Sequence, residues 1–202
     1  MNKKIFVILL VLMVSGVANA QRVKAAFGVT GGGVATQMNT DLTLNKPMYI
    51  SGYGGAFATV NFGSSIGLRG GANYSMQGAE LSLNGVPVQL NQSYLNVPIA
   101  FMYHIKSFIS VQAGFYQNIL LTSSLAEKGS DPYTLSPDPG ALKYNFGALA
   151  GIAVKIGRRV FVDIRSNLGL SKSYASMGVG YPMNTITLGV GFNIISTRQT
   201  IF

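Results

Sequence analysis

Residues capable of acid–base chemistry are few in this chain, and the sequence keeps them apart. The chain has a single histidine, His104, and no cysteine. Its six acidic residues are Asp41, Glu80, Glu127, Asp131, Asp138 and Asp163. Nucleophilic catalysis needs a nucleophile, a base and an orienting acid within hydrogen-bond reach of one another. The strand pattern described below places His104 at one end of the expected fold and every acid except Asp163 at the other, so we expect no enzymatic activity.

Three acidic residues in one polar segment are the best candidates for metal ligands. Glu127, Asp131 and Asp138 offer the hard oxygen ligands that calcium prefers. Their spacing does not match an EF-hand loop, and Asp before Pro is a common turn former. The sequence therefore predicts no bound metal and no cofactor.

Asp163 is the one acidic residue that the pattern places within a strand. Four basic residues, Arg69, Lys143, Lys155 and Arg165, are expected on the polar faces of the same set of strands. A buried ion needs a partner, so Asp163 is predicted to accept hydrogen bonds from one or more of these bases. We expect the five residues to form a charge network in the interior, with a structural role.

The alternation that places these residues is clearest in the segment 142–170. Its second arm carries Val160, Val162, Ile164, Leu168 and Leu170 on one face and Phe161, Asp163, Arg165, Asn167 and Gly169 on the other. The first arm alternates in the same way, and Gly157-Arg158-Arg159 joins the two arms. A side-chain period of two is typical of strands. Both arms reach the ~9–11 residues that a tilted strand needs to cross a bilayer.

The same alternation predicts eight strands along the chain. They lie at 22–35, 48–61, 66–76, 93–105, 108–121, 142–156, 160–170 and 183–195. In the second strand Tyr49, Tyr53 and Phe57 share one face, which the pattern leaves unassigned. Short connections near residues 63, 106 and 157 alternate with long ones near 41, 84, 131 and 177. Within the second long connection, Asn84-Gly85 predicts a small projecting hairpin.

Composition decides which environment such a barrel would occupy. The chain is 48% hydrophobic and only 10% charged, whereas soluble domains carry about 25% charged residues. A lipocalin-like soluble barrel would need a charged exterior, yet the polar faces here are mostly Gly, Asn, Ser and Thr. Those faces suit the narrow interior of an eight-stranded barrel, which side chains fill. We therefore predict an all-β fold, an eight-stranded antiparallel up-and-down transmembrane β-barrel of the outer membrane.

The N-terminus has the form of a secretory signal. Lys3 and Lys4 precede an apolar stretch, and Ala18-Asn19-Ala20 follows it. We expect a cleaved signal peptide at 1–20 and a barrel domain at 21–202, with both termini in the periplasm. The net charge is +9, but after Lys3-Lys4 no basic run is longer than Arg158-Arg159, which argues against nucleic acid. Outer-membrane lipid and lipopolysaccharide are the expected partners for the excess positive charge.

Three runs of sequence bear a family resemblance. They are SYLNVPIAFMYHI, YNFGALAGIAVKIGRRVFVDIRSNLGL and ITLGVGFNI. Together they resemble the PorT-like outer-membrane β-barrels of Bacteroidetes, over residues 22–195. The resemblance implies a structural or accessory outer-membrane role linked to protein secretion, with secretion-system components and the barrel-insertion machinery as partners. Phe192 and Phe202 are both candidates for the aromatic residue that this machinery reads.

Two other functions stay open on the sequence. The first is a surface-binding or adhesion barrel that acts through its long loops, especially 122–140. The second is a small pore, which the charge network predicted for the interior disfavours.

Overall fold

The computed structural model describes residues 23–38, 48–83, 86–127, 133–135, 144–171 and 183–196. Its regular elements are β1 (Val23–Met38), β2 (Tyr49–Phe62), β3 (Ile66–Leu83), β4 (Val86–His104), β5 (Ile109–Glu127), β6 (Tyr133–Leu135), β7 (Tyr144–Lys155), β8 (Val160–Gly169) and β9 (Met183–Ser196). Within these ranges no helix is long and apolar enough to cross a membrane. The segment 1–20 lies outside the described residues, so the signal peptide stays a prediction.

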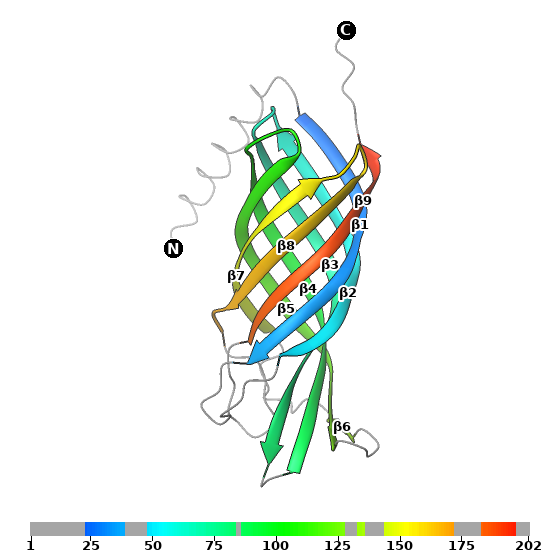
Figure 1. Cartoon of the computed structure of the whole chain (residues 1–202), viewed down its shortest axis with the longest axis vertical. Helices are drawn as coiled ribbons and strands as arrows, with labels where there is room; N and C mark the ends of the chain where they lie inside the picture. Colours follow the sequence, from blue (N-terminus) through cyan, green and yellow to red (C-terminus); the bar gives the residue numbers. More distant parts are fainter. Residues whose placement is uncertain are drawn as a thin grey trace, which may run out of the picture.

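Eight of the strands close into a ring in which every neighbouring pair is antiparallel (Figure 1). The ring runs β1–β2–β3–β4–β5–β7–β8–β9 and closes where β9 pairs with β1, for example at Val34↔Thr187. The short strand β6 pairs only with β5 and stands outside the ring. The predicted fold class, an eight-stranded antiparallel barrel, is confirmed.

The two faces of the barrel wall invert the pattern of a water-soluble protein. Outward-facing apolar side chains are exposed, such as Phe115 at 68% and Leu188 at 59%. Inward-facing polar residues are buried, including Asn118 and Asp163. An apolar exterior around a polar interior is the arrangement of a membrane barrel. The unassigned face of the second strand is also settled, because Phe57 is buried and Ile50 is exposed.

Glycine on neighbouring strands makes room for the largest side chains inside. A Cβ atom added at Gly191 would overlap the Phe161 ring, and one added at Gly189 would overlap the Tyr53 hydroxyl group. An eight-stranded barrel is narrow, so bulky interior residues fit only where the facing position has no side chain.

The two ends of the barrel differ in their connections. Tight turns at 63–65, 105–108 and 156–159 lie at one end, which we call the short-turn end. Gly63 occupies the left-handed region there, with φ of 68°. The start of β1 and the end of β9 lie at the same end, as the pairs Val23↔Phe62 and Ala26↔Ser196 require.

At the opposite end three strands continue well past the ring. The strands β3 and β4 pair as far as Leu83↔Val86, and β5 continues to Glu127, where it pairs with Val88. With β6 added at Ser123↔Leu135, they form a sheet in the order β3–β4–β5–β6 (Figure 1). We call the extensions of these strands, 77–83, 86–92, 120–127 and 133–135, the projecting sheet.

The projecting sheet corrects two predictions. The segments 77–92 and 122–140 were expected to be long connections, with only a small hairpin at Asn84-Gly85. The hairpin is confirmed, because Leu83 pairs with Val86 across positions 84–85. The long connections were wrong for most of 77–92 and for 122–127, which belong to the wall strands. Leu90 and Gln92 share a face of β4 there and are both buried, so apolar and polar residues no longer separate between the two faces. The alternation that identifies a strand is therefore weakened.

Candidate functional site

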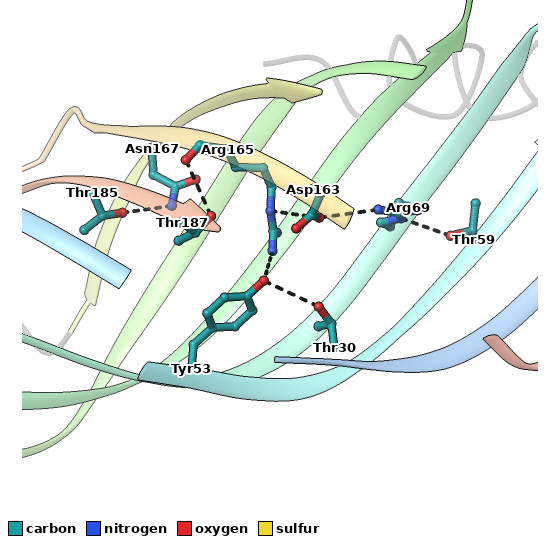
Figure 2. Close-up of polar contacts among 9 residues, drawn as sticks. All are labelled: Thr30, Tyr53, Thr59, Arg69, Asp163, Arg165, Asn167, Thr185 and Thr187. Carbon is teal, nitrogen blue, oxygen red and sulfur yellow. Dashed lines mark hydrogen bonds and ion pairs between the residues drawn. The ribbon is translucent and has the colours of Figure 1, made fainter. Parts of the chain in front are cut away.

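Three of the predicted interior charges come together in the lumen, the interior of the barrel. Asp163 on β8 is almost fully buried, and its Oδ2 lies 3.3 Å from Nε of Arg165 and 3.7 Å from Nη1 of Arg69 (Figure 2). Arg69 comes from β3, which stands diametrically opposite β8 in the ring. The Arg69–Asp163 ion pair therefore spans the lumen.

Hydroxyl groups hold the two guanidinium groups in place. Nε of Arg69 donates to Oγ1 of Thr59 at 3.2 Å, and Nη2 of Arg165 donates to the Tyr53 hydroxyl at 3.1 Å (Figure 2). That hydroxyl in turn lies 3.4 Å from Oγ1 of Thr30. Charge-assisted hydrogen bonds of this kind fix the planar guanidinium group in one orientation.

Aromatic rings complete the environment of both arginines. The rings of Phe57 and Phe161 meet edge to face with centroids 5.3 Å apart. Cζ of Arg69 lies 5.1 Å from the first centroid and 4.3 Å from the second, while Cζ of Arg165 lies 5.6 Å from the Tyr53 ring centroid. Both arginines are thus within cation–π range of an aromatic face. We call Tyr53, Phe57, Arg69, Phe161, Asp163 and Arg165 the lumen cluster.

The two cavities that border the lumen cluster are small. The cavities beside it measure about 20 Å³ and about 10 Å³, a volume that holds about one water molecule each. Oδ1 of Asp163 and both amide atoms of Gln112 are buried without a protein partner, so ordered water is their natural ligand. The cluster carries two cations against one anion.

The five residues of the predicted charge network lie in different parts of the structure. Arg69, Asp163 and Arg165 meet in the lumen cluster. Lys155 is exposed at the end of β7, and in the described part of the chain the ion pairs do not include it. Lys143 lies outside the described residues. Sequence reasoning missed the three aromatic members, although Phe161 shares its face with Asp163 and Arg165.

His104 lies at the short-turn end, away from any acidic side chain that the structure describes. Its Nδ1 lies 2.6 Å from Oγ of Ser110 and its Nε2 lies 2.8 Å from Oδ1 of Asn61. Both ring nitrogens are therefore engaged in neutral hydrogen bonds, and the ring is fixed between β2 and β5. A general base would need an orienting acid and a free nitrogen.

Among the described residues no group of three or more His, Asp or Glu side chains lies close enough together to hold a metal ion. Asp131 and Asp138 lie outside the described residues, so the predicted absence of a metal in their segment stays a prediction.

Solved structures with a similar fold include Ail and Neisserial surface protein A. Ail, the attachment invasion locus protein of Yersinia pestis, matches with a TM-score of 0.52 and 13% identity. The match covers 86% of this chain and all of Ail. Neisserial surface protein A matches with a TM-score of 0.59 and 12% identity, over 84% of this chain and 99% of that one. At such low identity these likenesses establish the fold alone.

Family membership rests on the sequence. No curated protein sequence matches the chain significantly. Residues 18–175, most of the chain, match the family model described as outer membrane protein beta-barrel domain. The protein is a β-barrel of the outer membrane, and its chain belongs to the outer membrane protein beta-barrel domain family.

Proposed function

We propose that this protein is a closed structural barrel that holds a partner protein on its projecting sheet. The observation that carries the proposal is the continuation of β3, β4 and β5 beyond the ring, at the end away from both barrel termini. A barrel needs only ~9–11 residues per strand to cross a bilayer, whereas these strands have 18, 19 and 19. The additional length builds a surface outside the membrane.

The edges of the projecting sheet supply the means of binding. Strand β2 pairs with β3 only as far as Tyr53↔Ser75, so beyond that point β3 has no strand on its β2 side among the described pairings. An unpaired edge exposes main-chain N–H and C=O groups, and an extended peptide can add to them as a new strand. This geometry favours a partner with an extended segment.

The orientation in the membrane belongs to the same proposal. Short turns and both barrel termini share one end, and in outer-membrane barrels short turns face the periplasm. The projecting sheet then lies outside the cell. The exposed apolar side chains on the outer face of the barrel support contact with lipid and lipopolysaccharide. Membership in an outer-membrane barrel family supports insertion by the barrel-insertion machinery.

The proposed role takes one of two forms, depending on which partner binds the projecting sheet. The resemblance to PorT-like barrels supports a secretion-system component, which would make this an accessory protein of secretion. Surface exposure of the sheet supports an external ligand instead, as in adhesion. Ail is named as an attachment invasion locus protein, but at 13% identity the likeness supports only a shared scaffold.

The test removes the projecting hairpin and leaves the ring intact. Residues 80–89 are deleted and the paired Ala79 and Leu90 are joined by an Asn-Gly turn. A matched control shortens the 172–182 connection by the same number of residues. We expect both variants to show the heat-dependent gel migration of a folded barrel. When intact cells are treated with a cross-linker, the wild type and the control should be recovered joined to the partner protein, and the hairpin deletion should not. Undiminished cross-linking in that variant would refute the proposal.

Two further measurements test the proposed orientation in the membrane and the proposed closed lumen. A C-terminal tag should be protected from protease in intact cells, and cleavage there would contradict the periplasmic orientation. Planar-bilayer recordings should show no steady conductance because the cavities beside the lumen cluster are small. A steady current would instead support the small-pore function.

A further inference from the structure

A second feature, separate from the projecting sheet, lies in the mouth of the barrel at the short-turn end. It is a hollow of about 430 Å³, lined by Lys24, Asn61, Gly63, Ser64, Ser65, His104, Ile105, Lys106, Ser107 and Lys155. We call it the short-turn vestibule. Its volume falls within the ~300–1,000 Å³ range of small-molecule sites, whereas the cavities beside the lumen cluster hold about one water molecule.

Ring geometry brings residues from separate strands into this vestibule. Lys24 on β1 pairs with Asn61 on β2, His104 ends β4, and Lys155 ends β7. The alternation of their strands places all four at inward-facing positions, close to the strand ends at the short-turn end. The main-chain N–H of His104 donates to the Ser65 carbonyl at 2.7 Å, which ties the β2–β3 turn to β4. The side chains thus converge from a fixed frame.

The charge of the vestibule is of one sign. Three lysines line it, together with the hydrogen-bonded His104, and no acidic residue among those the structure describes does. Lys24 and the deeper Arg69 both repel the ammonium group of Lys155. The carboxylate of Asp163, further inside, is already paired with two arginines. Converging cations of this kind create a local positive potential that favours an anion.

The neutral groups suit a phosphate in particular. Hydroxyl groups of Ser64, Ser65 and Ser107 stand among the lysines and can donate to anionic oxygens. Lysine binds phosphate as a compact point charge, and phosphate offers several acceptor oxygens to lysines that approach from different directions. A single carboxylate has fewer oxygens than this set of donors can serve.

We propose that the short-turn vestibule binds a phosphate group, carried by a lipid head group or by a soluble phosphorylated molecule. In both cases Lys24 and Lys155 contact the phosphate oxygens and Lys106 closes the site from the rim. The vestibule is at the opposite end from the projecting sheet, so this site and the proposed partner binding can fail independently.

The first experiment measures pyrophosphate binding to the folded barrel in octyl glucoside, a detergent without phosphate, by isothermal titration calorimetry. The test variant is Lys24→Gln with Lys155→Gln. The matched control is Arg158→Gln with Arg159→Gln, which removes the same charge at the same end but outside the vestibule lining. Heat-dependent gel migration confirms that both variants are folded.

We expect wild type and control to bind pyrophosphate alike and the test variant to bind at least about tenfold more weakly, because charge-assisted hydrogen bonds are lost. A second experiment counts phosphatidylglycerol molecules retained by each protein in native mass spectrometry. Retention that the test variant alone loses identifies a lipid head group as the source, and pyrophosphate binding without such retention identifies a soluble one. Equal weakening in both variants, or no binding of either probe by wild type, overturns the proposal.

Discussion

Replacing Asp163 by Asn is the sharpest test of how the lumen is stabilised. Asparagine keeps the size of the side chain but removes the one negative charge that faces Arg69 and Arg165 in the described part of the chain. Their guanidinium groups lie 3.7 Å and 3.3 Å from it. Removing one partner of a buried ion pair typically costs ~3–5 kcal/mol, because the remaining charge stays buried. The aromatic rings and the hydroxyl groups of Tyr53 and Thr59 still stabilise the arginines. We therefore expect a loss of about 3 kcal/mol, at the lower end of that range.

The assay is reversible urea unfolding of the barrel in lipid vesicles, followed by circular dichroism and by the fraction that migrates as folded protein. A double-mutant cycle with Arg69→Met isolates the pair. Because the double variant no longer leaves Arg69 facing an empty partner position, it should be more stable than the sum of the two single losses implies. Arg165 faces the introduced asparagine in both Asp163→Asn and the double variant, so its contribution cancels in the cycle. A change below about 0.5 kcal/mol for Asp163→Asn would refute the inference that this carboxylate stabilises the barrel.

Three further changes test other parts of the structure. Gly191→Ala should destabilise the barrel by ~1–3 kcal/mol in urea unfolding, since the new methyl group overlaps the Phe161 ring. Gly157→Ala, where nothing lies within 4 Å of the added Cβ, should be neutral, and equal effects at the two sites would contradict the packing argument. Leu188→Lys, on the exposed face near the middle of β9, should cost ~2–4 kcal/mol on folding into vesicles; no loss would place that face away from lipid.

Much of the barrel was predictable because the bilayer imposes one rule on every spanning strand. Lipid outside and a narrow polar lumen inside force strict alternation, which is why β8 was assigned face by face from sequence. The same rule does not hold in the extensions outside the ring, where apolar Leu90 and polar Gln92 are buried on the same face. The extensions of β3, β4 and β5 therefore looked like loops. Their pairing is evident only from the register of the closed ring.

The candidate site was predictable in its charges and not in its aromatic rings. Asp163 was the only acid on a predicted strand, so electrostatics alone indicated basic partners. Phe57 gave no such signal, because both faces of β2 carry apolar residues and either one could have faced lipid. Its contact with Phe161 depends on how far the strands are staggered around the ring, which local alternation does not determine.

The ion pair across the lumen also has a consequence for the order of folding. Arg69 and Asp163 stand on diametrically opposite strands, so hairpins and open sheets on the way to the barrel cannot form this contact. Its free energy is gained only when the ring closes. Interactions that are absent from the folding transition state slow unfolding and leave the folding rate nearly unchanged. The lumen cluster would then determine chiefly how long the closed barrel persists, a matter of kinetic stability.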